Sequence, residues 1–212
     1  YVDSNDKIIF SGISSKSTTI VQLTADGQLD TGFDASGALN GSPVFTEDDS
    51  AVKLDTDVAL ADTELDQLNS GNGNYAGASI TIARNGGGNP DDVMTFNTSG
   101  ASFTVSGNNL QSGGDTFAPF TNSNGTLAVS FTSSDTVATS ALMNNVMQHI
   151  TYANSSDNPP ASVQLDWLFD DGGADGKQGS GGGLSESGST TVTITAVNDA
   201  PTFTVGAQTI TE

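Results

Sequence analysis

The side chains of this chain that could do chemistry are almost all carboxylates. Of its 212 residues, 25 are Asp or Glu and 5 are Lys or Arg, giving a formal net charge of −20, and there is one histidine and no cysteine. Calcium takes about six to eight oxygen ligands from carboxylates, amides and backbone carbonyls. The composition therefore favours a hard-cation site over a thiolate or imidazole site. So acidic a chain repels nucleic acid and anionic membrane surfaces.

Five oxygen-bearing residues near the expected domain boundaries are the main candidate ligands for Ca²⁺. If their side chains converge at a junction, they supply a hard-oxygen set without His or Cys. They are Glu47, Asp62, Glu64, Asn198 and Asp199. The alternative interpretation is that these residues are solvated parts of loops.

A second acidic cluster lies between residues 170 and 176. Asp171 and Asp175 have a spacing suited to a calcium-binding turn. The stretch lacks both the nonapeptide repeat of a β-roll and the twelve-residue pattern of an EF-hand. An ordinary acidic hairpin loop is an equally good interpretation.

The sequence offers little for catalysis. His149, the single histidine, lies at the end of a predicted helix, where a packing or surface role is expected. Asp48 and Asp49, like Asp91 and Asp92, are adjacent, and neighbouring residues of a strand point to opposite faces, away from a shared cleft. We therefore expect no enzyme.

Sugar binding commonly needs exposed aromatic rings. Beyond Tyr1, the candidates are Trp167, Tyr75 and Tyr152, and Trp167 lies in the strand with the strongest core pattern. A core position is therefore expected for Trp167. A glycan-binding module remains an alternative function.

Period-two alternation predicts an all-β fold. Thr191, Thr193 and Thr195 alternate with apolar residues, and a proline follows at Pro201. Further strands are expected at residues 50–55, 78–83, 94–96, 101–105, 126–131 and 162–169. Apolar residues about four apart predict one short helix within 135–150, capped by Ser134 or Asp135. The predicted fold is an antiparallel β-sandwich with one short helix, preceded by a small N-terminal β-hairpin unit.

The chain divides into four predicted parts. Residues 1–35 form the hairpin unit, 36–43 a Gly/Ser-rich linker, 44–199 the sandwich, and 200–212 the start of a further domain. The linker repeats a degraded form of the later junction, because Gly41 stands where Asp199 stands. We therefore expect weaker cation binding and a flexible bend at the linker.

Two family resemblances follow from these motifs. Residues 5–12 and 21–33 resemble one delta-60 repeat, a family that implies further copies of a hairpin or propeller-blade unit. The segments VFTE (44–47), ADTELD (61–66), DWLFDDG (166–172) and TVTITAVNDAP (191–201) resemble bacterial cadherin-like or immunoglobulin-like repeats, over about three quarters of the chain.

The second resemblance implies a tandem array of sandwiches with Ca²⁺ near the junctions. Asp62-Thr63-Glu64 is similar to the D-x-E element of cadherins, and Asn198-Asp199 to their N-D linker. It implies adhesion, extension from the cell surface or matrix scaffolding.

The predicted function is thus a non-enzymatic structural or adhesive segment of a large extracellular or cell-surface bacterial protein, stiffened by Ca²⁺. One alternative is a fibre or surface-layer subunit joined by β-strand addition, in which residues 202–212 pair with a neighbouring copy. The expected partners are neighbouring repeats, other copies, or surface glycans and proteins. Nucleic-acid binding and membrane insertion are not expected, since no apolar run approaches about 18 residues.

Overall fold

The computed structural model describes residues 8–14, 17–23, 37–172 and 182–201. The chain separates into two compact units, residues 1–38 and 39–212. The boundary falls inside the linker predicted at 36–43. In the first unit, β1 (Ile8–Ser14) pairs antiparallel with β2 (Ser17–Leu23), so the expected N-terminal hairpin is confirmed.

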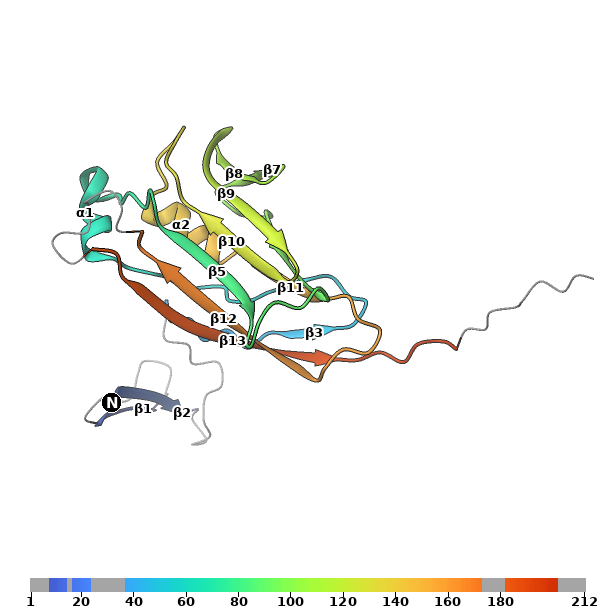
Figure 1. Cartoon of the computed structure of the whole chain (residues 1–212). Helices are drawn as coiled ribbons and strands as arrows, with labels where there is room; N and C mark the ends of the chain where they lie inside the picture. The colour runs from blue at the N-terminus through green and yellow to red at the C-terminus, as the bar shows by residue number, and fades with distance from the viewer. Residues whose placement is uncertain (1–7, 15–16, 24–36, 173–181, 202–212) are drawn as a thin grey trace, which may run out of the picture. The chain divides into compact units, whose positions relative to one another are not determined.

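The second unit is the predicted all-β sandwich. Its large sheet has eight strands in the order β3-β13-β12-β5-β10-β9-β8-β7, and its small sheet has three in the order β4-β11-β6 (Figure 1). All pairings are antiparallel except that of β3 with β13, which is parallel. The strands of the large sheet are β3 (Val44–Thr46), β5 (Ser79–Arg84), β7 (Thr104–Ser106), β8 (Asn109–Ser112), β9 (Asp115–Ser123), β10 (Thr126–Ser130), β12 (Ser162–Asp170) and β13 (Ser185–Thr195). Those of the small sheet are β4 (Val52–Lys53), β6 (Asp92–Phe96) and β11 (Ile150–Asn154).

The core lies between the two sheets, as the alternation predicted. In β12 every second residue from Val163 to Phe169 is buried, while the residues between them are exposed or half-buried. The central strands contribute fully buried side chains from both sheets. Among the largest are Phe45, Ile80, Ile82, Met94, Leu127 and Tyr152.

The prediction of a single helix is wrong, because the described residues of this unit already form two. The expected one is α2 (Ser140–Met147), capped by Thr139 rather than by Ser134 or Asp135: its hydroxyl oxygen accepts from the amide of Leu142 at 3.2 Å. The unexpected one is α1 (Thr63–Gly71), which turns non-helical at residues 68–70 and buries only Leu65. Within the described residues, no helix combines the length and apolar character needed to cross a bilayer.

The chain enters and leaves this unit at opposite ends of β13. Entering residue Leu39 lies against Gly188, near the start of β13, and the chain leaves after β13 ends at Thr195. We call the end near Ser185 the entry end and the end near Thr195 the exit end. Figure 1 shows β13 running from the α1 side of the unit to the segment that leaves it.

Candidate functional site

The parallel pairing of β3 with β13 brings Glu47 to the exit end. The Glu47 amide donates to the carbonyl of Thr195 at 3.0 Å, and Glu47 Oε2 accepts from the amide of Val197 at 2.7 Å. The side chain is 4% exposed, so its carboxylate is held against the departing chain. Asn198 and Asp199 follow directly and are exposed. Three of the five predicted ligands therefore lie along one short stretch.

Two further acids stand in the turn that follows β3. Asp48 adopts a left-handed conformation with φ of 64°, and the amide of Asp49 donates to the carbonyl of Thr46 at 3.1 Å. Both side chains are exposed beside Glu47. They were not among the predicted ligands, although the run Glu47-Asp48-Asp49 is the signal that could have found them.

Asp62 and Glu64 do not lie with the other three candidate ligands within this unit, because they stand at the start of α1. Asp62 is the N-cap, and its Oδ1 accepts from the amide of Leu65 at 2.8 Å. The helix leads into β5, whose Ser79 pairs with Asp170, which in turn pairs with Ser185 at the start of β13. That is the entry end, and eleven residues of strand at about 3.3 Å each separate it from the exit end.

In the second acidic cluster, Asp171 is bonded to Leu184, the residue just before β13. Asp171 is 6% exposed, its amide donates to the carbonyl of Leu184 at 3.0 Å, and its Oδ1 accepts from the Leu184 amide at 2.8 Å. Asp175 lies outside the described residues. In the part of the chain that the structure describes, no group of three or more His, Cys, Asp or Glu side chains is placed to hold a metal ion.

A buried ionic network joins the two sheets, and sequence reasoning missed it. Asp92 of β6 accepts from Arg84 of β5 at 2.7 Å (Nε) and 2.6 Å (Nη2), from the Tyr152 hydroxyl at 2.7 Å, and from Asn154 Nδ2 at 3.1 Å. Asp92 is 2% exposed. The hydrogen bonds to Asp92 raise the pKa of Arg84, so the ion pair stays charged. The one available signal was that Arg84 is the chain's single arginine.

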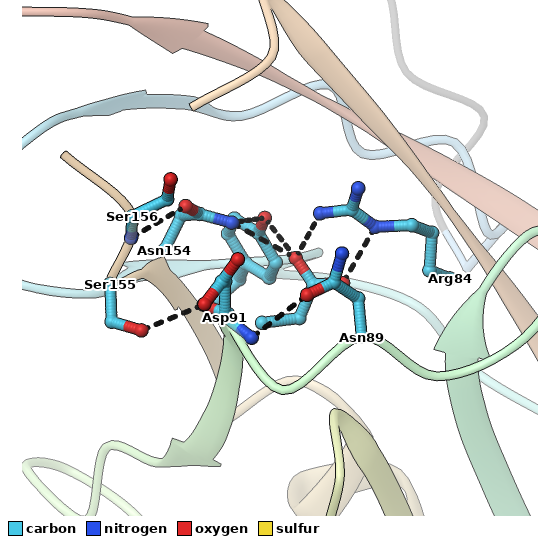
Figure 2. Close-up of polar contacts among 8 residues, drawn as sticks. Arg84, Asn89, Asp91, Asn154, Ser155 and Ser156 are labelled. Carbon is cyan, nitrogen blue, oxygen red and sulfur yellow. Dashed lines mark hydrogen bonds and ion pairs between the residues drawn. The ribbon is translucent and has the colours of Figure 1, made fainter. Parts of the chain in front are cut away.

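Turn residues around this network fix its geometry (Figure 2). Asn89 Oδ1 accepts from the amide of Asp91 at 2.9 Å, and the carbonyl of Asp91 accepts from the amide of Ser155 at 2.9 Å. Asn154 Oδ1 accepts from the amide of Ser156 at 3.1 Å. The two loops that flank the network are therefore bonded to each other.

A second polar cluster ties the two helices together at the entry end. Asp66 Oδ1 accepts from the hydroxyl of Tyr75 at 2.8 Å and also from the hydroxyl of Ser140, at the start of α2. Asp66 Oδ2 accepts from the amide of Asp62 at 3.2 Å. This cluster makes Asp66 a structural residue.

Both buried tyrosines should make stability depend on alkaline pH. Tyr75 and Tyr152 are 0% exposed, and burial, followed by the hydrogen bond to Asp66 or Asp92, raises the pKa of each phenol above its ordinary value. In the unfolded chain each ionises near pH 10, so the stability they contribute is complete below about pH 10 and is lost as the pH rises above it.

We expect the free energy of unfolding, measured by urea denaturation, to fall above pH 10, with a slope approaching about 1.4 kcal/mol per pH unit for each phenol. A double variant, Tyr75→Phe with Tyr152→Phe, lacks both phenols and should lose this part of the slope. An identical slope in the double variant would contradict the assignment.

The remaining candidate residues are buried. His149 is 7% exposed, its Nδ1 lies 2.8 Å from the carbonyl oxygen of Asn145, and its ring meets that of Phe103 edge-on at 6.0 Å. Trp167 is 4% exposed and donates from Nε1 to Thr190 Oγ1 at 3.0 Å, which confirms its predicted core position. With Tyr75 and Tyr152 also buried, none of the three predicted sugar platforms presents its ring to solvent.

Comparisons with protein-family models, with curated proteins and with solved structures find no match to this chain.

Proposed function

We propose that this chain contributes a non-enzymatic structural or adhesive module to a large extracellular bacterial protein, linked head to tail with neighbouring repeats and stiffened by Ca²⁺. The observation that carries the proposal is the contact between the Glu47 carboxylate and the Val197 amide, at 2.7 Å, directly before Asn198 and Asp199. It places a buried carboxylate where the chain leaves the sandwich.

The path of the chain supports a linear array. Entry beside Gly188 and exit after Thr195 put the two connections at opposite ends of one strand. Each repeat would therefore lengthen the array by about the length of a sandwich. A spacer or stalk needs this arrangement, whereas a domain inserted into a loop has its two ends close together.

The acids of the two ends suit an ion at the joint between repeats. Glu47, Asp48, Asp49 and Asp199 lie at the exit end, and Asp62 and Glu64 lie at the entry end. In a head-to-tail array, the exit end of one repeat faces the entry end of the next. Ligands equivalent to Asp62 and Glu64 would then come from the following repeat, and an ion would offset the repulsion between carboxylates on both sides of the hinge.

Thermal unfolding with and without Ca²⁺ tests this function. A ligand that binds only the folded state raises the melting temperature, by an amount that grows with the logarithm of the ratio of ligand concentration to dissociation constant. We expect millimolar Ca²⁺ to raise the melting temperature and a chelator to reverse the change, with Mg²⁺ as the control for ionic strength. An unchanged melting temperature would remove the calcium part of the proposal.

Strand addition between copies remains a second candidate, favoured by one edge of the large sheet. β7 is the outermost strand, all three of its residues are exposed, and Val105 is 40% exposed. Such an edge can accept a strand from another chain. Fibres in a purified sample would support this function, and a monodisperse monomer in Ca²⁺ would count against it. The glycan-binding alternative loses its aromatic platforms, since Trp167, Tyr75 and Tyr152 are buried.

A further inference from the structure

The entering segment, residues 39–43, is fastened to the sandwich along β13, and we call it the strap. Leu39 packs over Gly188, where an added Cβ would lie 2.7 Å from Leu39 Cδ2. Four residues later, the carbonyl of Pro43 accepts from the amide of Thr193 at 3.0 Å. The strap therefore follows β13 in the same direction as β3, which continues it. The flexible bend predicted for this segment does not fit these contacts.

The carboxylate of Asp55 holds the strap in place, and we call this side chain the latch. Asp55 Oδ2 accepts from the amides of Asn40 at 3.0 Å and Gly41 at 2.8 Å, while Oδ1 accepts from the amides of Asp57 at 3.1 Å and Val58 at 2.8 Å. Asp55 is 3% exposed. Hydrogen bonds to a buried charged acceptor are stronger than those between neutral groups. One side chain thus holds the strap with one oxygen and its own turn with the other.

Position 41 of the strap has room only for glycine. A Cβ there would lie 2.0 Å from the carbonyl oxygen of Leu54, a backbone atom that cannot move aside alone. Gly41 stands where the later junction has an acidic ligand, but the structure shows a different role: it allows close approach to Leu54 and Asp55, the two residues that follow β4.

The strap also closes one flank of the core. A pocket of about 410 Å³ lies beneath it, with a mostly apolar lining that includes Leu39, Val58, Met147, Trp167 and Gly188. Leu39 is therefore one wall of a pocket that reaches the chain's single tryptophan. Release of the strap would remove that wall.

We propose that the strap is the segment of this module that resists unfolding under pulling force, and that the Asp55 carboxylate holds it in place. Tension applied through the two connections pulls the strap and β3 towards the entry end and β13 towards the exit end, because the strands are parallel and the chain enters and leaves at opposite ends. The bonds along this seam are then loaded together in shear. The Asp55 bonds to Asn40 and Gly41 lie nearest the entry and share this load.

The device does not depend on Ca²⁺, because all its contacts are within the protein. The proposal for the strap is therefore tested in the presence of a chelator. A negative result there would count against the strap and would leave the calcium proposal untouched. The chain has no cysteine, so attachment points can be placed at will.

Single-molecule pulling in two geometries tests the proposal. In the first, cysteines replace Ala38 and Ala200 in the full chain, so that force passes through the strap. In the second, they replace the exposed Ser99 and Ser187, and the strap lies outside the loaded stretch. Asp55→Ala removes both acceptor oxygens, so the strap and the turn both lose their bonds to this side chain. We expect this variant to lower the unfolding force by roughly a third or more in the first geometry and little in the second.

Two control variants distinguish a role of the strap in resisting force from general destabilisation of the fold. Val129→Ala removes buried methyl groups far from the strap and should lower the force similarly in both geometries. Ser42→Ala changes an exposed side chain of the strap and should leave both unchanged. An Asp55→Ala variant with the same fractional loss in both geometries, or with none, would overturn the proposal.

Trp167 fluorescence gives an independent reading in the absence of force. Gly41→Ala leaves the Asp55 carboxylate in place but prevents the strap from packing in its position. Acrylamide should therefore quench the fluorescence of Trp167 more efficiently than in the unaltered chain. Circular dichroism should show that the strands remain intact. Ser42→Ala is again the control. Unchanged quenching in Gly41→Ala would show that the strap does not cover the pocket and would contradict the latch assignment.

Discussion

Replacement of Asp92 by alanine is expected to lower the free energy of unfolding by about 3–5 kcal/mol, as when one partner of a buried ion pair is removed. Asp92 is the common acceptor for Arg84, Tyr152 and Asn154, and it joins the large sheet to the small one. Its loss leaves three donors facing each other in the core. Arg84 keeps some access to water, since its side chain is 23% exposed, so Tyr152 and Asn154 carry much of the cost.

Urea denaturation of the variant measures this loss, with the m-value checked for two-state behaviour. Asp157→Ala is the matched control, because Asp157 is an exposed acid in the loop after β11 and should change stability by less than about 0.5 kcal/mol. Asp92→Asn should fall between the two, because the amide keeps one acceptor oxygen. A loss below about 1 kcal/mol for Asp92→Ala would show that the network does not hold the sheets together.

Phe45→Ala should also cost about 3–5 kcal/mol, through the cavity that it leaves. Phe45 is 1% exposed, and its ring meets that of Tyr152 edge-on, with centroids 6.1 Å apart and planes at 88°. It is the buried residue of β3, a strand of three residues. The ring therefore anchors the strand that carries Glu47 to the exit end.

The neighbouring Val44 supplies the control for this prediction, because it is 57% exposed on the same strand. Val44→Ala should change stability by less than about 0.5 kcal/mol, and Phe45→Leu should cost less than about 1.5 kcal/mol. Equal effects of Phe45→Ala and Val44→Ala in urea would mean that β3 is not anchored by its ring.

The sequence predicted those elements whose pattern is local. Alternating apolar residues located β5, β10, β12 and the second half of β13, and the four-residue spacing located α2. β9 was missed because Pro119 stands inside it, close to a register shift in its pairing with β8, where the register skips Phe117 of β9. α1 was missed because only Leu65 is buried, and because its cap, Asp62, was interpreted as a metal ligand.

The candidate site was less predictable because it depends on pairings between distant residues. Glu47 meets Val197 across 150 positions, and only the parallel pairing of β3 with β13 brings them together. The same holds for Asp55, which was expected only as the last residue of a strand at 50–55 but whose carboxylate accepts hydrogen bonds from four amides. An acidic residue in a strand-rich sequence does not reveal whether it meets water, a cation or backbone amides.

Calcium titration by calorimetry tests the central claim most directly, on the unaltered chain and on two isosteric variants. Glu47→Gln keeps an oxygen that can accept from Val197 but removes the charge, and Glu64→Gln makes the same change on an exposed side chain at the entry end. We predict a dissociation constant of about 10⁻⁴–10⁻³ M for the unaltered chain, as in extracellular modules, unchanged in Glu64→Gln and weakened at least about tenfold in Glu47→Gln. The absence of saturable binding by the unaltered chain, or equal affinity in Glu47→Gln, would contradict the account.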